Sequence, residues 1–254
     1  MKERRQIERE FGVPIAGEIL SPEQWTQTAL KKLPEGYLDW QKLFGRQSAV
    51  VLDVGCGNGR FLIGSAVWRP THDHLGIDIL PLVIRYATRR ANQRGLQNLR
   101  FAVGGARELL QEHVGPGSIA EIHCYHPQPY YDPAQVGRRL ITPEFLALVH
   151  RSLMPDGSFF VQTDNPGYWK YMKEVIPVFF DFQEQSRPWL DAPKGRTRRE
   201  IIALRRGLSV FRGRGVARSN LSSEEALRLA RTLPPPLFSA DRRLRELDVL
   251  EMGR

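Results

Sequence analysis

The clearest hydrophobic pattern in the chain is an apolar run at residues 50–54, which a glycine-rich turn follows at once. The run is aliphatic and β-branched without polar alternation, and its one acid is Asp53. This pattern is typical of a strand buried on both faces of a parallel sheet. Gly55, Gly57 and Gly59 come next, and a helical pattern starts at Arg60. Free backbone N–H groups at such a helix start favour a bound ligand.

Beyond this run, strand and helix patterns alternate along the chain, which predicts an α/β fold with a doubly wound, mostly parallel sheet. The expected strands are residues 50–54, 74–79, 98–103, 119–125 and 158–163, with 179–182 and 208–211 as a closing antiparallel pair. The expected helices are residues 81–94, 106–110, 143–153 and 168–176. We therefore predict a Rossmann-like sheet of seven strands, with ligands at the carboxyl ends of the parallel ones.

The chain is expected to have three parts. Residues 1–47 form an arm that packs on the core, with a helix start in which Ser21, Pro22 and Gln24 make a capping box. Residues 48–218 form the α/β domain. Residues 219–254 form a charged helical tail, which we predict to be peripheral and without chemistry.

The composition favours a cytoplasmic protein. The chain of 254 residues is 41% hydrophobic, which is enough for a full core. No apolar run approaches the roughly 20 residues that span a bilayer, and the charged first residues are unlike a secretory signal. Two cysteines, Cys56 and Cys124, suit a reducing compartment and offer no metal cluster. We expect a monomer or homodimer without membrane or metal.

The charge points to an anionic partner. The net charge is +9 and the isoelectric point is about 9.9, with the excess at residues 85–107 and 187–218. Such a balance fits nucleic acid, although a solvated surface is the simpler alternative. The helix at 81–94 is expected to carry its arginines on an outer face. They are Arg85, Arg89, Arg90 and Arg94.

The spacing of the glycines separates two kinds of nucleotide site. A dinucleotide fingerprint needs its third glycine three residues after the second, where this chain has Arg60. The D-x-G-x-G-x-G form instead resembles motif I of the class I S-adenosylmethionine (SAM) methyltransferases. Asp78 ends the next strand, and a carboxylate there can accept both hydroxyls of a ribose. Glycines that only shape a turn are the alternative.

Several later segments, taken in order, resemble the tRNA (guanine-N7)-methyltransferases over about residues 20–215. The matching segments are Asn98-Leu99-Arg100, Arg138-Arg139-Leu140-Ile141 with Phe145-Leu146, Thr163-Asp164 with Tyr168 and Met172, Arg187-Pro188, and Thr197 with Glu200. The resemblance implies a SAM-dependent enzyme that acts on tRNA.

The chain also departs from that family's pattern. Gly105 stands where the family has an acid, and the signature F-F-P-D-P-W-x-K is replaced after the fourth strand. Gln128 takes the place of its acid, Tyr130 of its tryptophan and Asp132 of its lysine. Fold and cofactor therefore follow from the resemblance more directly than activity does.

The resemblance implies roles for particular residues. Asp164 and Gln128 are the catalytic candidates. The candidates for SAM binding are Asp53, Gly55, Gly57, Gly59, Asp78, Ile79, Gly105, Ala106 and Gln128. The candidates for substrate binding are Asp132, Asp164, Tyr130, Arg138, Arg139, Thr197, Arg198, Arg199 and Glu200. The strand ends are expected to bring Asp53, Asp78, Gly105, Gln128 and Asp164 around one crevice.

Some of these residues have a simpler interpretation. Asp164 is expected to accept hydrogen bonds from the Watson–Crick edge of guanine, but it could instead cap the following helix. The arginines around Thr197 suit phosphate contacts, with a solvated loop as the alternative. They are Arg196, Arg198, Arg199, Arg205 and Arg206. His123 and His126 are interpreted as structural.

Three functions follow. The first is a SAM-dependent methyltransferase acting on N7 of a guanine in tRNA. The second is an amino-group methyltransferase, because Pro127-Gln128-Pro129-Tyr130 loosely resembles an N-P-P-Y motif. The third is a SAM- and RNA-binding protein with impaired catalysis, suggested by Gly105, Gln128 and Asp132.

Overall fold

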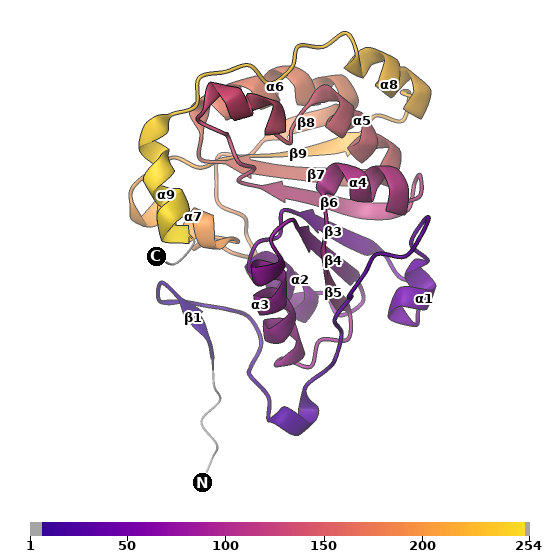
Figure 1. Ribbon diagram of the computed structural model, residues 1–254, viewed down its shortest axis with the longest axis vertical. Coiled ribbons are helices and arrows are strands. Elements are labelled where there is room, and N and C mark those ends of the chain that lie inside the picture. Colours follow the sequence, from indigo (N-terminus) through magenta and orange to yellow (C-terminus); the bar gives the residue numbers. More distant parts are fainter. Residues whose placement is uncertain (1–6, 252–254) are drawn as a thin grey trace. The chain divides into compact units, whose positions relative to one another are not determined.

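The structure is a computed structural model and describes residues 7–251 of the chain (Figure 1). These residues form two compact units. The first unit ends at His113 and the second begins at Val114. None of the helices within residues 7–251 has the length and apolar character that a membrane crossing needs.

The first unit is built on three parallel strands in the order β5-β4-β3. They are β3 (Val50–Val54), β4 (Asp73–Asp78) and β5 (Leu99–Val103). The register sets Asp53 beside Gly76, and Asp78 beside Val103, so that both acids stand near carboxyl ends of strands. Helices α2 (Arg60–Trp68) and α3 (Pro81–Asn92) pack against these strands. The remaining elements are β1 (Arg9–Glu10), β2 (Val13–Pro14), η1 (Pro22–Gln24), α1 (Trp40–Phe44), α4 (Ala106–Glu108) and the π-helix η2 (Leu109–His113).

The second unit has four strands in the order β6-β7-β9-β8. β6 and β7 are parallel, whereas β9 is antiparallel to both of its neighbours. The strands are β6 (Ile119–Tyr125), β7 (Leu153–Thr163), β8 (Phe180–Glu184) and β9 (Phe211–Ala217). The helices are η3 (Pro133–Arg138), α5 (Pro143–Ser152), α6 (Pro166–Phe179), α7 (Arg198–Arg205), α8 (Ser223–Ala230), η4 (Arg242–Leu244) and α9 (Arg245–Glu251).

The predicted α/β class with seven, mostly parallel strands is confirmed. One expected strand, at 208–211, was placed too early, because Leu208 still donates to Ala203 at the end of α7 and β9 starts at Phe211. β9 contains two glycines, so its sequence lacks the hydrophobic pattern typical of a strand. A Cβ on Gly213 would lie 2.2 Å from the Phe182 ring on the neighbouring strand, so the ring of β8 takes the place of a side chain there.

The expected helix start has Ser21 at the N-cap position and Pro22 as its first residue, as predicted, but the capping box was wrong. Only the short 3₁₀ turn η1 forms, and Ser21 makes no capping bond to its backbone. The Ser21 hydroxyl donates instead to the Gln24 side chain at 3.3 Å. The predicted division at residues 47 and 218 is not tested by these observations and stays a prediction.

Two of the arginines expected on the outer face of α3 are buried under the N-terminal arm. Arg90 donates to Glu8 at 2.7 Å and pairs with Glu10 at 2.8 Å. Arg94 pairs with Glu8 at 3.0 Å. Charges are buried at tolerable cost only when they are paired in this way. These two guanidinium groups therefore fasten the arm to α3 and are not part of a basic surface.

Candidate functional site

The glycine turn between β3 and α2 is shaped by the carbonyl of Ile77 on β4. The backbone N–H groups of Gly55 and Cys56 donate to that oxygen at 2.8 and 3.0 Å. Gly55, Gly57 and Gly59 all have positive φ, of 76°, 51° and 76°, which favours glycine at each position.

The three glycines differ in what surrounds them. A Cβ on Gly55 or Gly57 would meet nothing within 4 Å, so these two positions face open space. A Cβ on Gly59 would lie 2.6 Å from the Phe101 ring and 2.9 Å from Ala87. Gly59 is thus required for packing, while Gly55 and Gly57 leave bare backbone for a ligand.

Asp78 joins the glycine turn to the end of β4. Its two carboxylate oxygens accept from the N–H groups of Gly57 at 3.1 Å and Leu80 at 2.9 Å. Burial raises the pKa of this carboxyl, and the backbone donors oppose that rise only in part. Beside it, Ile79 is 64% exposed and Val103 is 45% exposed. An acid between bare glycines and exposed apolar side chains fits a ribose and a flat ring, the parts of a nucleoside.

The other predicted cofactor residues of this unit take ordinary conformations. Asp53 is buried at the end of β3. Gly105 is the N-cap residue of the three-residue helix α4, and Ala106 is the first residue of that helix. A Cβ on Gly105 would meet Glu108 only at an ordinary 3.6 Å, so nothing in the described structure requires glycine there.

One group in the described residues could offer three metal ligands, Glu108, Glu112 and His113. The two acids are exposed, and the His113 ring faces the Gly36 carbonyl at 3.2 Å. Exposed acidic groups are common without a metal, and the expected absence of a metal stays a prediction.

In the second unit, the loop after β6 holds two residues in the left-handed region. His126 has a φ of 51° and Tyr130 a φ of 44°. Side chains other than glycine adopt this region only when neighbours hold them there, and such strain gathers at functional sites. The His126 N–H donates to the Gln162 carbonyl at 2.8 Å. Gln128 lies between the two strained residues and is exposed.

Asp164 directly follows β7 and is 7% exposed. One oxygen accepts from Arg199 at 2.7 Å, and the other lies 3.5 Å from the His126 ring. Burial opposes ionisation, but the nearby His126 ring, and then the Arg199 guanidinium, outweigh it and hold the pKa of Asp164 well below its usual range. Asp164 is therefore a fixed anion. It does not cap α6, because Asn165 accepts the Tyr168 N–H there, so the helix-cap alternative was wrong.

Glu200 is the centre of a buried polar network at the start of α7. It is fully buried and pairs with Arg212 on β9. Its other oxygen accepts from Gln162 at 3.1 Å and from the Arg196 N–H at 2.7 Å. Thr197 caps the helix by accepting the Glu200 N–H at 3.1 Å. Thr197 and Glu200 thus hold α7 in place.

Comparison with known proteins decides the family. The model of the methyltransferase family Methyltransf_4 matches residues 47–212. A curated tRNA (guanine-N(7)-)-methyltransferase of Alkalilimnicola ehrlichii is 30% identical over 191 residues, which cover 74% of this chain and 81% of the relative. The protein of that name from Halorhodospira halophila is 31% identical over 184 residues, 72% of this chain and 80% of the relative. The chain belongs to the tRNA (guanine-N(7)-)-methyltransferase family.

The predicted site residues of this tRNA (guanine-N(7)-)-methyltransferase family member fall into two groups. Asp53, Asp78 and Gly105 lie in the first unit, and Gln128 and Asp164 in the second. The structure brings Gly57 against Asp78 in one unit and His126 against Asp164 in the other. The expected single crevice stays a prediction.

Two arginines predicted to bind substrate have different surroundings in this family member. Arg138 is exposed at the end of η3. Arg139 is 2% exposed and donates to four carbonyl oxygens at 2.6–3.1 Å. Those carbonyls belong to Pro129, Tyr130, Pro236 and Phe238. Asp132 caps η3 by accepting the Ala134 N–H.

The tail is not peripheral, contrary to the prediction. Helix α9 packs on α7, where Arg199 pairs with Asp248 and, at 3.7 Å, with Glu251. Arg198 donates to the Leu250 carbonyl at 3.3 Å. The arginine loop is thus not simply solvated at these positions. This contact lies beyond residues 47–212, which the family model matches.

Three further residues of the buried network around Glu200 were not evident from the sequence pattern: Gln162, Trp189 and Arg212. Gln162 accepts from the Trp189 indole at 2.9 Å and contacts His126 as well as Glu200. An inward glutamine and arginine in two neighbouring strands were the available signal, because polar residues in buried strands need partners.

Asp78 should make SAM affinity depend on pH. The predicted role of Asp78 is to accept the ribose hydroxyls as an ionised carboxylate, and the pKa of this carboxyl is raised. As the pH falls, affinity should therefore begin to decline at a higher pH than for an ordinary aspartate, and then by up to about tenfold per pH unit. Calorimetric titration from pH 7 to 4, with circular dichroism to verify folding, measures this. Asp78→Asn should bind weakly with a flat profile; an equally steep profile for that variant would assign the effect to another group.

Proposed function

We propose that this chain transfers the methyl group of SAM to N7 of a guanine in tRNA. The proposal rests on the relatives of that name, whose matches cover 72–74% of the chain. The net charge of +9 suits a polyanionic substrate. A cytoplasmic location and a monomeric or homodimeric state stay predictions of the same kind.

The residues of the glycine turn fit SAM. Gly55 and Gly57 present bare backbone, and Asp78 offers acceptor oxygens beside the exposed Ile79. SAM, when bound, supplies an electrophilic methyl group on a sulfonium. We assign the remaining predicted SAM contacts of the first unit, Asp53, Gly105 and Ala106, to the same role.

Guanine N7 carries an in-plane lone pair and no proton, so its methylation needs no general base. What the chain must supply is alignment of the acceptor base and a suitable field for the cationic ring that forms. We assign the guanine edge to Asp164, because a carboxylate can accept from both N1–H and N2–H₂. His126 and Arg199 keep it ionised and fix its direction.

The test uses unmodified tRNA and radiolabelled SAM, followed by digestion and identification of the methylated nucleoside. Formation of 7-methylguanosine supports the proposal. Label on an exocyclic amino group would support the amino-group methyltransferase instead. SAM binding without transfer to any tRNA would support the impaired homologue, which Gly105 and Gln128 favour.

Gln128→Asp restores the family's acid on an exposed loop position. A carboxylate near the cationic product ring should raise kcat by about tenfold, because it stabilises charge that develops in the transition state. Gln135→Asp, at an exposed position of η3, makes the same charge change and should leave kcat unchanged. Single-turnover methylation measures both. Equal rates for the two variants would contradict an electrostatic role for position 128.

A further inference from the structure

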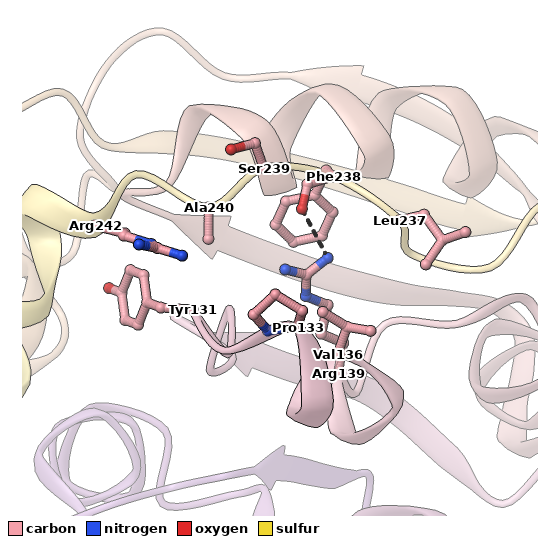
Figure 2. Close-up of a pocket in the computed structure, with 9 residues that line it drawn as sticks. All are labelled: Tyr131, Pro133, Val136, Arg139, Leu237, Phe238, Ser239, Ala240 and Arg242. Carbon is pink, nitrogen blue, oxygen red and sulfur yellow. Dashed lines mark hydrogen bonds between the residues drawn. The ribbon is translucent and has the colours of Figure 1, made fainter.

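A pocket of about 300 Å³ lies in the second unit between η3 and the tail segment that precedes α9. Figure 2 shows Tyr131 and Arg242 at one end of it and Leu237 at the other. Pro133 and Phe238 supply further apolar wall. The tail side of this pocket lies outside residues 47–212, which the family model matches.

Of the residues that the structure describes, two arginines and no acidic residue line the pocket. Arg139, which lines it, is buried, and the four groups to which it donates are neutral carbonyl oxygens; the structure gives it no ion pair within residues 7–251. Its guanidinium lies 3.6 Å from the Phe238 ring centroid. Arg242 is exposed and likewise has no ion pair among the described residues. A buried cation without a counter-ion favours an anion nearby.

The walls suit a flat ring next to that anion. An aromatic side chain such as Tyr131 can stack on any nucleobase, whatever the RNA sequence. A guanidinium can bind the phosphate that adjoins the base. The pocket is also continuous with the loop after β6, because Arg139 donates to the carbonyls of Pro129 and Tyr130 at 2.6 and 3.1 Å. A nucleotide that lies here is next to the loop that carries Gln128.

We propose that this pocket binds one nucleotide of the tRNA chain near the target guanine, with its base on Tyr131 and its phosphate on Arg242. The inference rests on the proposed function for the identity of the RNA. It adds a contact outside the family's matched region and gives the tail a direct part in substrate binding.

The experiment measures binding of unmodified tRNA over a series of salt concentrations. Arg242→Ala should weaken binding about fivefold and lower the salt slope by about one phosphate contact. Arg243→Ala is the matched control, because Arg243 is 90% exposed, does not line the pocket and already pairs with Asp241 at 2.7 Å. It should change affinity by less than about twofold. Identical behaviour of the two variants would overturn the proposal.

Substitutions at Tyr131 distinguish the contribution of base stacking to tRNA binding from the contribution of charge. Tyr131→Ala should weaken binding at least about fivefold with an unchanged salt slope, and Tyr131→Trp should restore it. Loss that tryptophan does not restore would overturn the stacking role. Guanosine monophosphate is the probe for a free-nucleotide site: if it binds as tightly as tRNA and depends on the same residues, the assignment to an RNA chain is wrong.

These readouts are independent of methyl transfer. If the chain forms 7-methylguanosine and the Tyr131 and Arg242 variants bind tRNA as tightly as the original chain, the proposed nucleotide pocket is wrong and the proposed function stands. Salt-dependent tRNA binding that requires both residues, without transfer, would support the pocket while the proposed function fails.

Discussion

Asp164→Asn is expected to lower kcat/KM for tRNA methylation by about 100-fold or more, because it removes one partner of a buried charge pair to which we have assigned recognition of the guanine. Asparagine keeps the shape of the side chain. However, it replaces one acceptor oxygen by a donor, which faces either Arg199 or the donor groups of guanine. Arg199 keeps Asp248 and Glu251 as partners, so the variant should still fold.

Asp181→Asn provides the comparison. Asp181 lies on β8, and its side chain is 76% exposed beside Arg218. Its removal should leave kcat/KM within about twofold, as exposed pairs contribute little. Steady-state methylation is measured for both variants, with SAM binding as the test of folding. If Asp164→Asn keeps activity within threefold of the original chain, Asp164 has a structural role only.

Glu200→Ala is expected to lower the free energy of unfolding by about 3–5 kcal/mol, because it leaves the Arg212 guanidinium buried without its counter-ion. Arg212 is only 3% exposed, and Glu200 is inaccessible to solvent. The change also frees the Gln162 amide and the Arg196 N–H. Since domains are stable by about 5–15 kcal/mol, this is a large part of the total.

Urea denaturation followed by circular dichroism measures this loss. Glu246→Ala is the matched control, because Glu246 pairs with Arg206 at 3.0 Å while both side chains are about half exposed. It should cost no more than about 1 kcal/mol. Glu200→Gln keeps the shape of the side chain and part of its hydrogen bonding, so its loss of unfolding free energy should lie between those of Glu200→Ala and Glu246→Ala. A Glu200→Ala loss as small as that of the control would mean that water reaches Arg212.

The strands were predictable because their signal is local. The apolar runs at β3 and β6 have the bounds expected from the sequence, and Asp78 was correctly associated with the glycine turn. β9 was misplaced because Gly213 and Gly215 pack against rings of β8, a contact that is not visible in their own segment.

The partners of the charged residues could not be predicted in the same way. Arg90 was expected on a surface, but its acceptor Glu8 lies 82 positions earlier in the chain. Arg199 resembles a phosphate ligand by its motif, yet Asp248, 49 positions later, pairs with it. The local sequence around an arginine can be the same whether the side chain forms a buried ion pair or contacts RNA. Only the three-dimensional fold distinguishes these two roles.

The burial of Arg139 under the tail has a consequence for folding during synthesis. The carbonyl of Pro236 that accepts from this guanidinium lies 97 positions later in the chain. At about 5–20 residues per second, the ribosome makes that acceptor some 5–20 s after Arg139 itself. Until then the guanidinium has to stay hydrated, because a buried cation without acceptors is strongly unfavourable. The loop after β6 therefore reaches its final conformation only after residues 236–238 have been synthesised, late in translation of the chain.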